Sequence, residues 1–207
     1  MIEFLQKAGP LIYPLGLCSV LASTIIIERV YSLRRSRVLP REIVGVVEAV
    51  QPGRDLSLAV DVCRRNPGVF ADVMLAGLEL ASGPWEIMRD SLLDAGRQRT
   101  TLLERYLVWL QTIAQVAPLL GLLGTVTGMM KVFSSISLSG LGDPAALSEG
   151  ISEAMITTAL GLGIGIPTLV AYNLLAAKSE GLITEIEAHA SSLIGRLRRK
   201  PGLETAT

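Results

Sequence analysis

Five polar side chains stand inside or beside long uncharged stretches of this 207-residue chain, and these residues are the best placed to do chemistry. They are Thr125, Thr127, Glu153, Thr157 and Thr158. A carboxylate can bind and release a proton, and a hydroxyl can donate a hydrogen bond to the ionised form or accept one from the protonated form. Facing lipid would cost the carboxylate roughly a few kcal/mol. The sequence therefore predicts a polar strip that lines a water-filled or helix-filled cavity.

Helix geometry leaves two interpretations of these residues open. Glu153 and Thr157 are one turn apart on one face, and Thr158 lies about 100° further round. In the alternative interpretation, Glu153 sits at the outer interface, where it reaches lipid headgroups or pairs with Lys131. The threonine hydroxyls can equally donate to carbonyls of their own helix. Residue types alone do not separate a polar strip from these local arrangements.

The other reactive residue types are too few and too scattered for a metal or catalytic centre. His189 is the only histidine, Cys18 lies in an apolar run and Cys63 lies in a charged segment. A zinc site or a disulfide framework needs clustered histidines or cysteines, so we predict no metal, no cofactor and no enzyme activity. Basic and acidic residues balance at 19 each, and 4% of residues are aromatic, which argues against a nucleic-acid partner.

Three long uncharged runs decide the fold class. They cover residues 8–27, 106–130 and 154–177, in a chain that is 50% hydrophobic and only 18% charged. A bilayer core needs about 20 consecutive apolar residues in a helix. Only Lys7 precedes the first run as a charge and no small-residue cleavage site follows it, so we interpret this run as a retained span. The sequence predicts an all-α integral membrane protein with three transmembrane helices and long cytoplasmic helical extensions.

The distribution of Lys and Arg predicts the orientation of the spans. Residues 28–105 carry twelve of these residues and the segment from Lys178 onward carries five, whereas residues 134–150 carry none. Short cationic loops stay in the cytoplasm. We therefore expect a periplasmic N-terminus, a cytoplasmic C-terminus and a multi-pass location in the membrane.

Breaker residues and charge divide the chain further. Gly and Pro punctuation predicts short helices near 41–50, 54–65 and 69–81, then one long helix from Trp85 into the second span. The third span is expected to continue past Lys178 to a basic end that lies near anionic lipid. The predicted regions are 1–27 (N-terminus and first span), 28–105 (cytoplasmic helices), 106–133 (second span), 134–150 (periplasmic loop), 151–177 (third span) and 178–207 (cytoplasmic helix and tail).

Glycines recur in the second and third spans at helical spacing. They are Gly121, Gly124, Gly128, Gly161 and Gly165. Small residues four apart let helix backbones approach closely in lipid, where no hydrophobic force drives association. We predict that these glycines pack the two spans against each other.

The same two spans resemble the signature segments of the MotA/TolQ/ExbB proton channel family. The segment from Ala117 to Met130 reads APLLGLLGTVTGMM, and the segment from Gly150 to Pro167 reads GISEAMITTALGLGIGIP. The first span, which ends in Ile-Ile-Ile-Glu-Arg29, is also similar. The length and the three spans resemble the ExbB/TolQ branch rather than the longer, four-span MotA branch.

This resemblance implies a homopentamer in the bacterial inner membrane whose second and third spans surround a central pore. It implies an ExbD/TolR-like single-span partner that carries an intramembrane aspartate, and a TonB/TolA-like protein that receives the work of proton flow. By position, Thr125 and Thr158 are implied to face that aspartate, and Glu153 to line the pore. Thr127 stands where some members carry an aromatic residue.

Two other functions are compatible with the residues alone. In a structural membrane scaffold, the glycines and threonines would serve packing only. A secondary transporter is less compatible, because three spans without repeats are too few to enclose a substrate site unless several chains assemble.

Overall fold

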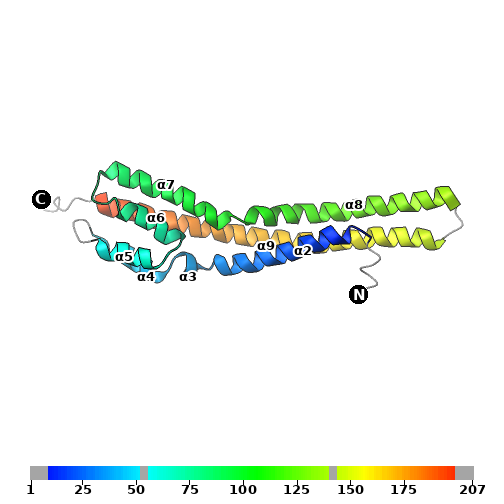
Figure 1. Cartoon of the computed structure of the whole chain (residues 1–207), viewed down its shortest axis with the longest axis horizontal. Coiled ribbons are helices and arrows are strands. Elements are labelled where there is room, and N and C mark those ends of the chain that lie inside the picture. Colours follow the sequence, from blue (N-terminus) through cyan, green and yellow to red (C-terminus); the bar gives the residue numbers. More distant parts are fainter. Residues whose placement is uncertain (1–8, 52–55, 140–143, 199–207) are drawn as a thin grey trace, which may run out of the picture. The chain divides into compact units, whose positions relative to one another are not determined.

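The computed structural model describes residues 9–51, 56–139 and 144–198 (Figure 1). The regular elements in these ranges are helices, as the sequence predicted. Their bounds are α2 Ile12–Ser32, α3 Arg35–Val38, α4 Arg41–Glu48, α5 Ser57–Arg65, α6 Val69–Leu78, α7 Trp85–Glu104, α8 Leu107–Ser139 and α9 Pro144–Arg198.

The chain divides into two compact units. We name Met1–Arg29 with Tyr106–Leu175 the membrane unit, and we name Val30–Arg105 with Ala176–Thr207 the extramembrane unit, after its expected position outside the bilayer. Three helical stretches are long and apolar enough to cross a bilayer, which is consistent with a three-span integral membrane protein. These stretches are Ile12–Ser32, Trp85–Ser137 and Leu147–Arg198.

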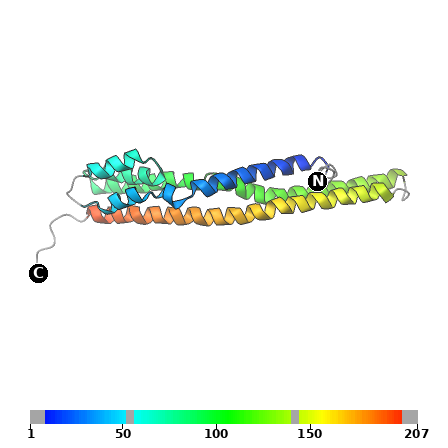
Figure 2. The same ribbon diagram turned by 90° about the horizontal axis from the view of Figure 1, so that it is seen from below.

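Within the membrane unit, α8 runs beside the first part of α9 in both views (Figures 1 and 2). Each of these helices contains a proline, Pro118 in α8 and Pro167 in α9. Both helices also extend into residues 134–150, since α8 ends at Ser139 and α9 begins at Pro144. Most of the expected loop is therefore helical, and residues 140–143 lie outside the described part of the chain.

The prediction of one long helix from Trp85 into the second span is wrong. Helix α7 ends at Glu104, and α8 starts at Leu107 after a turn. At this turn, the guanidinium carbon of the buried Arg29 lies 4.8 Å from the centre of the Tyr106 ring. No proline or glycine marks the turn, so the local sequence carried no signal for it.

The extramembrane unit is built around a conventional aliphatic core. The predicted short helices are present as α4, α5 and α6, whereas α3 was not predicted. Phe70 is fully buried in this unit, together with Val73 and Met74 from the same helix and Ile186 from α9. The prediction that α9 continues past Lys178 is confirmed, because the helix runs without interruption to Arg198.

Candidate functional site

Glycines form the contact between α8 and α9 at its closest point. A methyl group on Gly161 would lie 2.6 Å from the carbonyl oxygen of Ala117 and 2.9 Å from the Cα of Gly121. A methyl group on Gly121 would in turn lie 3.0 Å from the carbonyl oxygen of Thr157. These neighbours are backbone atoms that cannot rotate away, so only glycine fits without a shift of the helices.

The other predicted packing glycines continue this contact along both helices. Gly124 faces the side chain of Thr157, and a methyl group on Gly128 would lie 2.8 Å from the carbonyl oxygen of Gly150. At the other end, a methyl group on Gly165 would lie 2.5 Å from the ring of Pro118. All five predicted glycines therefore lie where the two helices approach.

Thr157 lies within this contact and faces no open space. Its side chain is 1% exposed and occupies the room left by Gly124. Its hydroxyl donates to the carbonyl oxygens of Glu153 and Ala154, each at 3.0 Å. The hydrogen-bonding capacity of Thr157 is thus directed along its own helix.

Two threonines lie on one side of the contact, at its edge. The Thr158 hydroxyl donates across the helix pair to the carbonyl oxygen of Gly121, at 3.1 Å. The Thr125 hydroxyl donates to the carbonyl oxygen of Leu122 in its own helix, at 2.7 Å. Both side chains are partly exposed in the single chain. We call this pair the threonine edge.

An ion pair occupies the opposite edge. The ammonium nitrogen of Lys131 lies 2.7 Å and 2.6 Å from the two carboxylate oxygens of Glu153. Glu153 and Thr158 are five residues apart, which places them about 140° apart around α9, on either side of Thr157. We call Lys131 and Glu153 the ion-pair edge. The remaining predicted residue, Thr127, donates to the carbonyl oxygen of Gly124 within α8.

Glu153 is enclosed by more than its ion pair. The residue is only 8% exposed, although the Lys131 side chain is 56% exposed. Gly9 packs so closely that a methyl group there would overlap the Glu153 carboxylate, and its φ of 64° is in the left-handed region that favours glycine. Pairing with Lys131 was one of the alternatives that the sequence left open. The contribution of Gly9 was missed, since a lone glycine near a terminus gives no such signal.

The extramembrane unit holds two further candidate reactive groups, His189 and Cys63. The Nδ1 atom of His189 lies 3.6 Å from the Glu48 carboxylate, and its ring packs against Phe70. Burial raises the pKa of the Cys63 thiol to about 11, so this cysteine is not a ready nucleophile. Among the residues that the structure describes, His, Cys, Asp and Glu form no group able to hold a metal ion.

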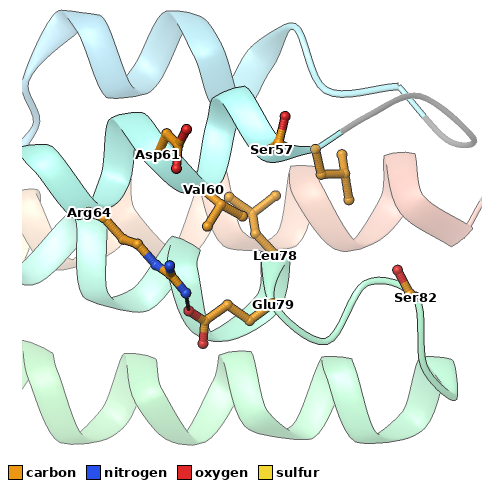
Figure 3. A pocket seen from close by; sticks show the side chains of 8 residues that line it. Ser57, Val60, Asp61, Arg64, Leu78, Glu79 and Ser82 are labelled. Carbon is orange, nitrogen blue, oxygen red and sulfur yellow. Dashed lines mark hydrogen bonds and ion pairs between the residues drawn. The ribbon is translucent and has the colours of Figure 1, made fainter.

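A cavity of about 680 Å³ also lies in the extramembrane unit, between α5 and the end of α6 (Figure 3). Its wall contains an ion pair between Arg64 and Glu79, whose nearest atoms are 2.8 Å apart. Asp61 lines the same wall. The two paired groups satisfy each other at an exposed surface, so this cavity carries no indication of catalysis.

Known proteins resemble this chain over most of its length. It is 34% identical over 176 residues to a putative ExbB-like biopolymer transport protein of Synechocystis, covering 81% of each chain. It is 26% identical over 196 residues to the biopolymer transport protein exbB1 of Vibrio cholerae, covering 88% of this chain and 82% of the relative. It is 34% identical over 137 residues to the Tol-Pal system protein TolQ of Pseudomonas aeruginosa, covering 66% of this chain and 55% of that protein.

The family comparison agrees with the arrangement of the helices. The sequence profile of the MotA/TolQ/ExbB proton channel family matches residues 66–188, which include both α8 and the membrane part of α9. The family is described as one of proton channels, and the relatives are named as biopolymer transport and Tol-Pal system proteins. On this match, on the relatives and on its three apolar helices, the chain belongs to the MotA/TolQ/ExbB proton channel family, in its ExbB/TolQ-like branch.

Proposed function

We propose that this chain is the channel subunit of an inner-membrane motor that converts the proton motive force into mechanical work. In this proposal, five copies surround a pore, and a single-span ExbD/TolR-like partner threads that pore with an intramembrane aspartate. The work passes to a TonB/TolA-like protein and supports energised transport at the outer membrane. Family membership supports the proposal, and the observation that carries it is the partly exposed threonine edge, which lies within the uncharged stretches of α8 and α9.

The threonine edge is suited to a partner carboxyl that gains and loses a proton. The hydroxyls of Thr125 and Thr158 each donate to a backbone carbonyl, which leaves the oxygen lone pairs free to accept from a protonated aspartic acid. Rotation of either hydroxyl would redirect its hydrogen toward the ionised aspartate. Both charge states are then hydrogen-bonded, which brings their energies closer together in a low-dielectric pore.

The energy available to such a motor is set by the membrane potential. Each proton that crosses is worth about 2.3 kcal/mol per 100 mV. Several crossings are thus enough to drive a change in the packing of a partner subunit, without covalent chemistry in this chain.

The proposal is tested by removing both hydroxyls of the threonine edge. We expect Thr125→Ala/Thr158→Val to lower proton influx by about an order of magnitude, because a lost hydrogen bond to a charged group is worth about 1.5–3 kcal/mol. Influx is measured in proteoliposomes that contain the chain with its co-purified partner and an entrapped pH-sensitive dye. Thr112→Val is the matched control, because Thr112 donates to Val108 in the same helix, as Thr125 does to Leu122.

A structural scaffold is the second candidate function. The observation that favours it is that the hydroxyls of Thr125, Thr127 and Thr157 all donate to carbonyls of their own helices. If the chain is a scaffold, every variant that still assembles should give the same influx as the wild type, or no protein should give any influx. Equal rates in the double variant and the Thr112→Val control would reject the channel proposal.

The orientation is part of the same proposal. We expect a reporter after Gly53 or after Lys200 to be cytoplasmic and one near Gly142 to be periplasmic, because Lys and Arg are concentrated on one side. These three positions lie outside the described residues. A periplasmic signal at Gly53 would reverse the orientation, and with it the direction of proton flow through the unit.

A further inference from the structure

The ion-pair edge combines three contacts that the threonine edge lacks. Both carboxylate oxygens of Glu153 are within 2.7 Å of the Lys131 ammonium nitrogen. The carboxylate is also covered by the backbone at Gly9. Glu153 therefore joins α8, α9 and the segment that leads into α2, all within the membrane unit.

These contacts leave Glu153 poorly placed to carry protons. A proton carrier must exchange its proton with the groups on either side of it along the path. Protonation of Glu153 would break its ion pair and leave the Lys131 charge without its partner at the edge of the membrane. The carboxylate also lies on the opposite side of α9 from Thr158. A partner aspartate that contacts the threonine edge would not meet Glu153 of the same subunit.

We propose that Lys131 and Glu153 act as positioning residues, which fix the connected ends of α8 and α9 and the entry to α2, and that Glu153 is not a station on the proton path. This inference rests on the proposed channel function, and it assigns the path to the threonine edge alone. Glu153 then affects transport only through the arrangement of the helices. Its charge matters because Lys131 is present.

A double-mutant cycle separates this role from proton transfer. The variants are Glu153→Gln, Lys131→Met and the double variant Lys131→Met/Glu153→Gln, each purified with its partner subunit. Lys131→Met leaves the buried Glu153 carboxylate unpaired, so we expect the fraction of intact complexes to fall by about tenfold. Glu153→Gln leaves a half-exposed ammonium and should lower this fraction less, and the double variant should recover most of the loss from Lys131→Met. Intact complexes are counted by native mass spectrometry.

Proton influx per intact complex distinguishes the two roles. A residue that only positions the helices leaves this rate unchanged, whereas loss of a residue on the proton path lowers it. We expect the double variant to match the wild type within about twofold and to keep the same dependence of influx on pH, since no path group has been removed. A loss of tenfold or more per intact complex in the double variant would overturn the inference, because the carboxylate itself would then be required.

If the variants do not assemble, a measurement on the wild-type complex tests whether Glu153 takes up protons during transport. Dicyclohexylcarbodiimide reacts with protonated carboxyl groups in apolar surroundings, so a carboxyl that takes up protons during transport is modified. We expect mass spectrometry to find Glu153 unmodified between pH 5 and pH 8, and its modification would overturn the inference. If the wild-type complex conducts no protons, the channel proposal fails, and the assembly cycle still tests the ion pair separately.

Discussion

The two units of this chain use opposite packing rules. In the membrane unit, helices α8 and α9 approach through glycine, and large side chains such as Leu122, which is 58% exposed, point outward. In the extramembrane unit, the core is filled by large side chains such as Phe70, which is 0% exposed. Lipid tails are as apolar as leucine, so burying leucine within the membrane unit gains little and close backbone contact decides the packing. In water, burial of apolar area is the dominant stabilising term.

Polar groups differ between the units in the same way. The threonines of α8 and α9 donate to carbonyls, so their polar atoms are satisfied where water is excluded. In the extramembrane unit, charged side chains such as Arg35 and Glu185 pair at the surface. The membrane unit also holds the pair of Glu28 and Arg29 and, between α8 and α9, the ion pair of Lys131 and Glu153. Its position at the end of the span explains how such a pair is tolerated.

The largest expected effect comes from creating a cavity in the core of the extramembrane unit. We expect Phe70→Ala to destabilise the extramembrane unit by about 3–5 kcal/mol, because the lost ring leaves a void among fully buried side chains. Hydrogen exchange measured across α4 to α7 would report the loss as faster exchange. Leu122→Ala is the control in the membrane unit. An equal loss of protection from Leu122→Ala would contradict the contrast between the units.

A bulky side chain in the glycine contact should give the next largest effect. We expect Gly161→Leu to destabilise the helix pair by about 1–3 kcal/mol and to weaken assembly, because its neighbours are backbone atoms. Gly163→Leu is the matched control two residues away, where nothing lies within 4 Å of the added carbon. Thermal unfolding in detergent and native mass spectrometry measure both effects. Normal assembly and stability of Gly161→Leu would show that the complex does not need close contact between the two helices.

A smaller effect distinguishes glycine contacts in the two units. A methyl group on Gly77 would overlap only the side-chain end of Leu92, which can rotate, whereas one on Gly161 meets backbone. Alanine also favours helix by about 1 kcal/mol over glycine. We therefore expect Gly77→Ala to change the unfolding midpoint little and Gly161→Ala to lower it. A larger decrease in the unfolding midpoint for Gly77→Ala than for Gly161→Ala would contradict this contrast.

The smallest expected effect concerns the exposed pair of Arg35 and Glu185. Hydrogen bonds from the Arg35 guanidinium, aided by its charge, lower the pKa of the Glu185 carboxyl. A lowered pKa in the folded state stabilises the protein above the pKa of the unfolded carboxyl, and this contribution is lost as the pH falls through the folded value. We expect Arg35→Gln to lower the unfolding midpoint slightly at pH 7 and not below about pH 4. A difference that persists at low pH would have another cause.

Periodicity and composition predicted most of the fold. The three uncharged runs predicted three helices of spanning length, and the Gly and Pro punctuation predicted α4, α5 and α6. These features are local, because they depend on residues close together in the chain. The turn at Tyr106 was not predicted, since a contact with Arg29 accompanies it and no local breaker marks it.

The candidate site shows the same division between local and long-range information. The sequence by itself determined that four threonines lie within long uncharged stretches and Glu153 directly beside one, and that glycines recur at a spacing suited to close packing. The tertiary structure decided that Thr157 is buried, that Thr125 and Thr158 share one edge, and that Glu153 pairs with Lys131 beneath Gly9. Helical spacing fixes the angles between residues on one helix, but only the packing of a second helix determines which of those directions is buried, exposed or paired.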